Sequence, residues 1–281
     1  MSSSPLFSAP TATGKRRLVV HLGFPKTATT TIQAMLAANA DRLGPGVAVS
    51  PKDELTLKLR KNALRYMRSG GKFWFKWRHG VAMREMVRKI DAMDFETLLI
   101  SDENMVGIES GKIFDPPGGV DCAAWVKRLD AALSGYEVTY VLYTRDPAPW
   151  RVSAYNQAFK MRRVTEPFAD WAVKHDDLGG PARIVEELRG FLGERLKTLD
   201  MADEIGPGKL MGRYLLELAG VSEERIAGIV VPPRKNESLP PAAIEFLKCA
   251  RANPRLRGAR YRDLVRLCAR HPDLFSKEFH A

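Results

Sequence analysis

The chain has 281 residues, of which 45% are hydrophobic and 27% charged, and its formal net charge is +11. This length and apolar content suffice for one large core and are ordinary for a single α/β domain. No apolar run approaches the roughly 20 residues that a membrane-spanning helix needs, so the sequence predicts no such segment.

Residues 1–16 are rich in Ser, Pro, Ala and Thr and lack the apolar segment of a secretory signal, so we expect a disordered leader. The remainder, residues 17–281, is expected to form one domain. The cysteines Cys122, Cys249 and Cys268 are odd in number and scattered, which favours free thiols in a reducing compartment. A cytoplasmic location is therefore expected.

Strand-like and helix-like patterns alternate along the chain. Strands are expected at 17–22, 97–101, 136–144 and 196–200, with a further extended segment within 226–231. Helices are expected at 29–40, 54–68, 72–91, 120–133, 149–162, 167–174, 181–195, 209–219, 240–251 and 258–270. This alternation predicts an α/β fold with a central, mainly parallel sheet flanked by helices. Ligands of such sheets bind beyond the carboxyl ends of the strands, so the loops after the first three strands should line one cleft.

The loop after the first strand carries one lysine and four threonines, in the order Phe24-Pro25-Lys26-Thr27-Ala28-Thr29-Thr30-Thr31. A loop that opens a helix presents unpaired backbone N–H groups and the positive end of the helix dipole. The lysine adds a full charge, so the loop suits a phosphate or sulfate ester. It is not a Walker A motif, because no glycine directly precedes the lysine.

A second anion-binding pattern follows the strand at 136–144. Arg145 ends this strand, and Ser153 lies eight residues later in the next expected helix. A guanidinium can bind a phosphate through two hydrogen bonds, which a lysine cannot do. Together, the two segments resemble the 5′-phosphosulfate loop and the 3′-phosphate-binding segment of sulfotransferases that use 3′-phosphoadenosine 5′-phosphosulfate (PAPS).

The resemblance implies the sulfotransferase variant of the P-loop fold and transfer of a sulfuryl group from PAPS to a hydroxyl or amine, without a metal. It implies that the donor is bound by Lys26, Thr27, Ala28, Thr29, Thr30, Arg145 and Ser153. Lys26 would also be catalytic, because its charge neutralises the leaving oxygen. Ala28 stands where the family usually has glycine, so we expect a near-helical backbone at this position.

Transfer to a hydroxyl benefits from a base that takes the acceptor proton. Glu103, in the loop after the strand at 97–101, is the first choice, although it could instead hold Lys26 or cap the next turn. Glu54 and His79 are the alternatives. His21 lies within the first strand and is expected to be a core histidine.

The segment from residue 52 to residue 89 contains twelve Lys or Arg and only three acidic residues. It also contains Phe73, Trp74, Phe75 and Trp77, of which Phe73 and Trp77 recur at helical spacing and favour core packing. The basic excess predicts an anionic acceptor, a glycan or lipid-linked glycan rather than a nucleic acid. A solvated helical face and a peripheral membrane contact remain the alternatives.

Two other functions stay open at this point. One is a P-loop kinase or other NTPase, and the other is a family member that binds a nucleotide or glycan without turnover. A late loop, residues 232–239, loosely resembles the segment that closes over the nucleotide in the family.

Overall fold

The computed structural model describes residues 14–69, 72–105, 122–160, 164, 166–174, 180–233 and 239–275. Most of the expected leader and residues 234–238 of the late loop lie outside this part.

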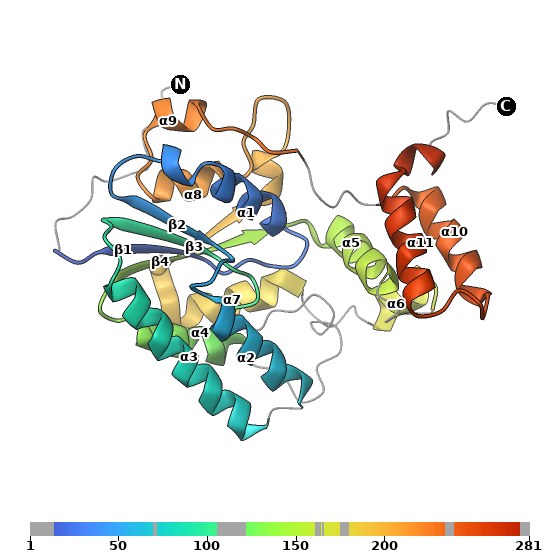
Figure 1. The fold of residues 1–281 in the computed structure, drawn as a ribbon, viewed down its shortest axis with the longest axis horizontal. Helices are drawn as coiled ribbons and strands as arrows, with labels where there is room; N and C mark the ends of the chain where they lie inside the picture. Colours follow the sequence, from blue (N-terminus) through green and yellow to red (C-terminus); the bar gives the residue numbers. More distant parts are fainter. Residues whose placement is uncertain are drawn as a thin grey trace.

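Five strands form one sheet in which every neighbouring pair runs parallel, in the order β2-β3-β1-β4-β5 (Figure 1). They are β1 (Arg17–His21), β2 (Val47–Pro51), β3 (Thr97–Ser101), β4 (Glu137–Thr144) and β5 (Leu196–Asp200). The predicted α/β fold, a parallel sheet flanked by helices, is therefore confirmed.

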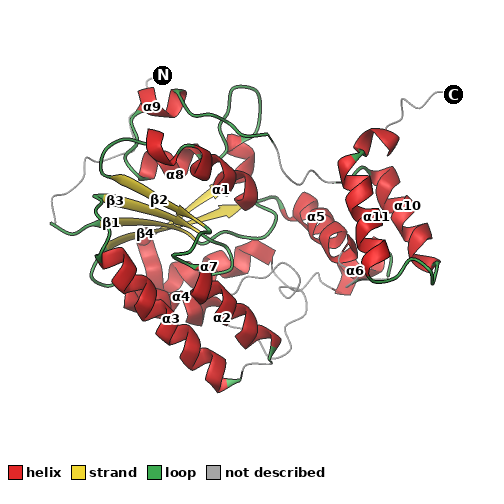
Figure 2. Ribbon diagram, viewed as in Figure 1, coloured by secondary structure: helices red, strands yellow, loops and turns green. Residues whose placement is uncertain are grey.

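Helices connect the strands and continue after the last one. They are α1 (Thr29–Ala38), α2 (Leu57–Arg68), α3 (Phe73–Asp91), α4 (Cys122–Ala132), α5 (Pro147–Lys160), α6 (Phe168–Lys174), α7 (Gly180–Leu192), α8 (Arg213–Leu218), α9 (Glu223–Ala227), α10 (Pro241–Ala252) and α11 (Ala259–Arg270). Figure 2 shows α1, α8 and α9 on one face of the sheet and α3, α4 and α7 on the other, with α2 packed along α3.

The two faces arise from the alternation of side chains along each buried strand. In β1, Leu18 and Val20 point into the core beneath α3, α4 and α7, whereas Val19 points into the core beneath α1 and α8. All three side chains are almost fully buried. Parallel strands covered on both faces read as continuous apolar runs, which is why β1, β3 and β4 are recognisable in the sequence.

A third apolar core lies away from the sheet. Ala158 and Phe159 of α5 pack with Trp171 of α6 and with residues of α10 and α11, among them Leu247 and Tyr261. Figure 1 shows these helices grouped beside the carboxyl edge of the sheet, with α5 leading from β4 into the group. α5 therefore connects the end of β4 to this helical group.

Two sequence-based expectations about strands are wrong. β2 was not expected, because Val47–Pro51 is short, contains alanine and ends in proline. The extended segment expected within 226–231 is instead the end of α9 and a loop. There, the Asn39 side chain bonds both the N–H and the C=O of Val230, so these two groups are not paired with a neighbouring strand.

The aromatic residues at the start of α3 also differ from expectation. Phe73 and Trp77 were expected in the core, yet they are 76% and 49% exposed. The buried stripe of α3 begins only at His79, so its first turn extends beyond the core. The three cysteines are free thiols, as predicted. None of the described helices is both long and apolar enough to cross a membrane.

Candidate functional site

The site lies where the chain reverses its direction of travel across the sheet. β1 and β4 are neighbours, but the chain goes from β1 to β2 on one side and from β4 to β5 on the other. Ligands of open parallel sheets bind outside the carboxyl ends of the strands at such a point. Here, those ends lead into the loop before α1 and into Arg145.

The backbone carbonyl of Phe24 accepts the hydrogen bonds that hold the loop before α1 together. The oxygen of Phe24 accepts the Thr27 N–H at 3.3 Å, the Thr27 hydroxyl at 2.6 Å and the Thr29 hydroxyl at 3.4 Å. The two hydroxyl protons are therefore used inside the loop rather than offered to a ligand. Thr30 is exposed at the start of α1.

The backbone of the loop, rather than its threonine hydroxyls, is free to donate. Within the described residues, no acceptor is bonded to the N–H of Ala28, Thr29 or Thr30. These groups sit at the N-terminus of α1, where the helix dipole is positive. The unpaired backbone N–H groups expected at the start of this helix are thus present, whereas the Thr27 and Thr29 hydroxyls are bonded within the loop.

Ala28 adopts a left-handed conformation, with φ 60° and ψ 16°, so the expectation of a near-helical backbone is wrong. The carbonyl of Ala28 accepts from Thr31 and Ile32, and the chain must turn sharply at this residue to enter α1. A residue with a Cβ pays about 1–2 kcal/mol for this conformation. Glycine, usual here in the resembling family, would adopt it without that strain.

We expect Ala28→Gly to raise the free energy of unfolding by up to about 1 kcal/mol, because relief of strain outweighs the added freedom of the unfolded chain. Ala34→Gly is the matched control within α1 and should lower it by about 1 kcal/mol, since its backbone is already helical. Urea denaturation of the three proteins measures both changes. A destabilising Ala28→Gly would contradict the left-handed backbone.

Two side chains that follow β4 hold this loop in place. The Trp150 indole donates to the carbonyl of Pro25 at 2.9 Å, and Arg145 Nη1 donates to the carbonyl of Lys26 at 3.2 Å. The Trp150 ring also packs on Phe24, with ring centres 5.6 Å apart. The structure thus brings the two predicted segments, around Lys26 and Arg145, into direct contact.

Positive charges gather around Lys26. Burial, followed by the nearby charges of Lys160 and Arg145, lowers the pKa of Lys26 to about 8. Burial also lowers the pKa of Lys160. In the described part of the chain, no carboxylate pairs with any of these three cations. Such a cluster is costly without an anion and favourable with one.

One face of α5 continues the cluster. Ser153, Gln157 and Lys160 are spaced by four and three residues, which places them on the same side of the helix. The Gln157 side-chain oxygen accepts from Lys26 Nζ at 3.4 Å, so this side faces the loop. Ser153 is half-buried one turn before Gln157. Lys160 was not expected at the site, although its spacing from Ser153 could have indicated it.

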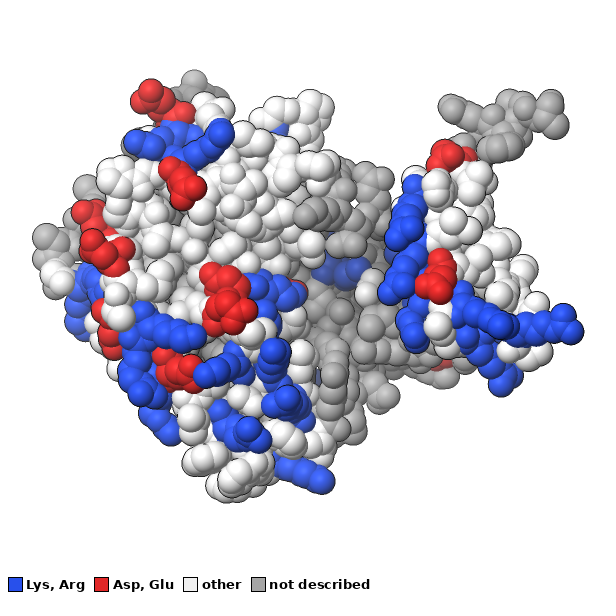
Figure 3. Space-filling model, in the orientation of Figure 1, with Lys and Arg blue, Asp and Glu red and all other residues white. Residues whose placement is uncertain are grey.

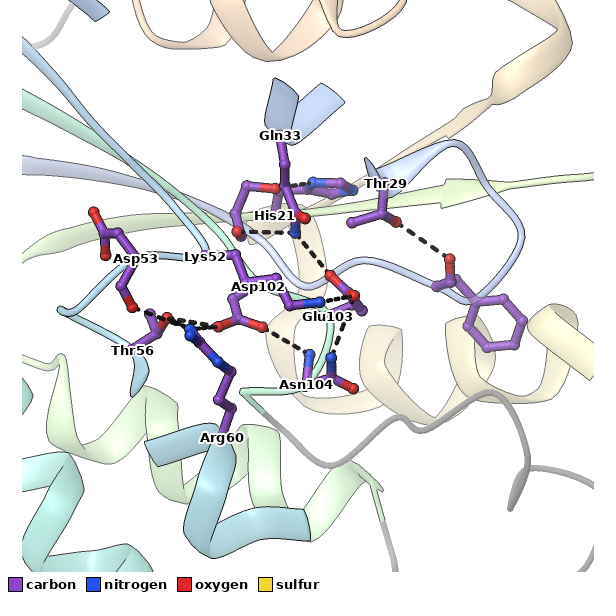
Figure 4. Close-up of polar contacts among 12 residues, drawn as sticks. His21, Thr29, Gln33, Lys52, Asp53, Thr56, Arg60, Asp102, Glu103 and Asn104 are labelled. Atoms are coloured by element: carbon purple, nitrogen blue, oxygen red, sulfur yellow. Dashed lines mark hydrogen bonds and ion pairs between the residues drawn. The ribbon is translucent and has the colours of Figure 1, made fainter. Parts of the chain in front are cut away.

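Glu103 binds Lys52 rather than Lys26 (Figure 4). Its carboxylate accepts from Lys52 Nζ at 2.5 Å, Gln33 Nε2 at 2.7 Å and Asn104 Nδ2 at 3.2 Å. Burial acts to raise the pKa of Glu103, but the hydrogen bond and charge of Lys52, with the other donors, lower it overall. A carboxylate held this way is ionised and weakly basic.

Gly23 lets the loops after β1 and β3 approach each other. Its φ is +62°, and a Cβ added there would lie 2.6 Å from the Cβ of Glu103. A side chain at this position would be strained and would push Glu103 away. Glu103 is therefore held beside the loop before α1 by close packing as well as by its donors.

Asp102, the residue before Glu103, is completely buried. It accepts from the Thr56 hydroxyl at 2.5 Å, Arg60 Nη1 at 3.0 Å and the Asn104 N–H at 3.0 Å. Burial raises its pKa despite these donors. Its oxygens are committed to linking β3 to α2 (Figure 4). The described residues contain no group of three or more His, Cys, Asp or Glu arranged to hold a metal.

His21 and His79 are buried and neutral. His21 Nδ1 lies 2.8 Å from the Ser101 hydroxyl, and burial lowers its pKa to about 4 despite the nearby Glu103 charge. His79 packs against the ring of Trp125 at 3.9 Å, and burial lowers its pKa to about 3. His79 thus belongs to the core between α3 and the sheet. His21 packs against Tyr143 in the core on the opposite face of the sheet, beneath α1 and α8. Glu54 is exposed on the turn before α2.

Comparison with known proteins adds nothing to this geometry. No protein-family model matches the chain, and no curated protein matches its sequence.

Proposed function

We propose that this protein transfers a sulfuryl group from PAPS to a hydroxyl or amine of an anionic glycan or glycolipid. The observation that carries the proposal is the cluster of Lys26, Arg145 and Lys160 beside the open N–H groups of α1. These three cations meet no carboxylate in the described residues, and a ligand with phosphates at both ends of a nucleoside would supply the missing charge.

In this proposal, the backbone donors of Ala28, Thr29 and Thr30 bind the 5′-phosphosulfate, and Lys26 contacts the oxygen that bridges phosphorus and sulfur. Arg145 and Ser153 bind the 3′-phosphate. The acceptor oxygen or nitrogen forms a bond to sulfur as the bridging sulfur–oxygen bond breaks. The electron pair leaves with adenosine 3′,5′-bisphosphate, where the Lys26 ammonium stabilises the developing charge.

The acceptor proton needs a destination, and Glu103 remains the proposed base by its place beside the loop. Its contacts with Lys52 and Gln33 lower its basicity, so proton transfer requires Lys52 to shift toward the incoming anion. The buried, neutral His79 contacts Trp125 and the carbonyl of Met105, which does not favour it as a base. Glu54 stays open as the alternative.

The kinase or NTPase alternative is less well supported. Its Mg²⁺ would need a free carboxylate after a neighbouring strand. Asp102 is in such a position, after β3, but Thr56, Arg60 and a backbone N–H occupy it. The remaining alternative, a protein that binds the nucleotide without turnover, would use the same cluster. Only an activity assay distinguishes this alternative from the proposed transferase.

The acceptor half of the proposal is tested by transfer of labelled sulfate from PAPS to a panel of acidic polysaccharides, acidic glycolipids and neutral sugars. We expect the anionic acceptors to be used, with a KM that rises between low and physiological salt as charge attraction is screened. The KM for PAPS should change less. Preferred use of a neutral sugar, with a KM independent of salt, would overturn the anionic acceptor.

A further inference from the structure

An exposed aromatic group projects from the start of α3. Phe73, Trp74 and Trp77, which we call the aromatic tip, are 76%, 57% and 49% exposed. The rings of Trp74 and Trp77 stack with centres 4.9 Å apart. Figure 1 shows this end of α3 as the lowest point of the molecule, pointing away from the sheet. Large apolar side chains gathered at one protruding point indicate an interaction surface.

Basic side chains surround the aromatic tip. Apart from Lys58, which pairs with Glu85, the exposed ones on α2, at the N-cap of α3 and on its first turns form what we call the basic collar: Lys61, Arg65, Lys72, Lys76 and Arg78. Among the described residues, none of them pairs with a carboxylate. Figure 3 shows Lys and Arg side chains over this lower part of the molecule.

The acidic residues between positions 52 and 89 lie away from the basic collar and do not neutralise its positive charge. Glu85 pairs with Lys58 and lies 3.9 Å from Lys89, farther along α3. Asp53 and Glu54 precede the other end of α2. The collar therefore presents a positive surface around an apolar point, which complements a negatively charged partner with an apolar interior.

We propose that the aromatic tip and the basic collar dock this protein onto an anionic lipid bilayer. Tryptophan is favoured at the boundary between headgroups and acyl chains, and each Lys or Arg near an anionic surface adds about 1 kcal/mol of attraction. The long basic side chains can reach the headgroups while the aromatic rings enter the boundary.

The other occupants fit less well. A second copy of this chain would bring one basic collar against another, which is repulsive. A polysaccharide would satisfy the charges, but Phe73 on a protruding point offers no concave surface and no hydrogen-bonding group to a sugar. In addition, Trp74 and Trp77 already cover part of each other's ring faces by stacking.

Docking at the aromatic tip would bring the bilayer toward the candidate site. This consequence, unlike the docking itself, rests on the proposed function. α2 begins beside the buried contact of Arg60 with Asp102, close to Glu103. Figure 1 shows its other end beside the start of α3, the helix that bears the aromatic tip. A bilayer at the tip would thus lie at one end of a helix whose other end borders the candidate site. A lipid-linked acceptor could be presented there.

The test is sedimentation of the full chain with phosphatidylcholine vesicles, with and without phosphatidylglycerol. We expect binding only to the phosphatidylglycerol vesicles, with a blue shift of tryptophan fluorescence, and we expect high salt to weaken it. Trp74→Ala with Trp77→Ala, and separately Lys72→Glu with Lys76→Glu, should each lower the partition constant about tenfold or more.

Matched controls remove an exposed apolar or basic group elsewhere. Val231→Ala, from a 62% exposed side chain, and Lys209→Glu should leave binding unchanged. Circular dichroism checks that each variant folds. The proposal would be overturned by equal binding to neutral vesicles or by binding that the tip and collar variants do not change. It would also be overturned by retention on heparin without vesicle binding, or by a dimer that the tip variant dissociates. None of these readouts depends on PAPS.

Discussion

Replacing Lys26 with methionine is expected to lower the rate of the proposed sulfuryl transfer by about 10²-fold or more, because one preorganised contact to a developing charge is worth about 3 kcal/mol. The same variant should make the ligand-free protein more stable. Lys26 is largely buried beside Arg145 and Lys160, so its charge is unfavourable until an anion binds. Loss of activity together with a gain in stability would indicate that the Lys26 charge destabilises the ligand-free protein and serves to bind an anion.

The gain in stability should depend on pH in a defined direction. The pKa of Lys26 is about 8 in the folded protein, below its ordinary value of 10.5. The cost of the charged form is therefore fully present below pH 8 and disappears as the pH rises toward 10.5. One pKa unit corresponds to about 1.4 kcal/mol, so Lys26→Met should add about 1–3 kcal/mol at pH 7.

Urea denaturation at pH 7 and near pH 10.5 measures this difference, and Lys209→Met, at an exposed lysine, is the control that should show no change. A Lys26→Met variant that is less stable at pH 7, or whose advantage grows at high pH, would show that Lys26 is stabilised in the folded protein. Near-normal turnover would show that it is not catalytic.

Arg145→Lys is expected to weaken binding of adenosine 3′,5′-bisphosphate by about tenfold while changing ADP affinity much less. A lysine keeps the charge but loses the paired donors of the guanidinium, and a charge-assisted hydrogen bond is worth about 1.5–3 kcal/mol. It also loses the hydrogen bond from Arg145 to the carbonyl of Lys26, which affects both nucleotides alike. The ratio of the two affinities therefore isolates the 3′-phosphate.

Isothermal titration of both nucleotides supplies this ratio, with Arg189→Lys on α7 as a control at an exposed arginine. An equal loss for the two nucleotides would assign Arg145 to positioning the loop alone.

The strands that frame the site could be predicted because they are buried on both faces. β1, β3 and β4 read as apolar runs, and each ends in a polar loop that bears a candidate site residue. β2 could not be recognised, because alanine and a terminal proline weaken its pattern. The loops that bear Lys26 and Arg145 were expected to line one cleft. Their direct contact was not predicted, because it depends on β1 and β4 being neighbours, which periodicity does not reveal.

The partners of individual side chains were harder to predict than the elements that carry them. The bond of Glu103 to Lys52 depends on the unexpected β2, which places Lys52 at the same edge of the sheet. The left-handed backbone of Ala28 is set by the entry into α1 and opposes the preference of alanine. The exposure of Trp77 follows from where the buried stripe of α3 begins, which helical spacing alone does not show.

The central claim, a site built for a nucleotide with a 3′-phosphate, is tested most directly by titrating the unaltered protein with adenosine 3′,5′-bisphosphate and with ADP. The two nucleotides differ in where the second charged group is attached, so the comparison asks whether the surroundings of Arg145 and Ser153 receive a 3′-phosphate. We expect adenosine 3′,5′-bisphosphate to bind about tenfold or more tightly than ADP. Equal affinities, or a preference for ADP, would contradict the PAPS-dependent function.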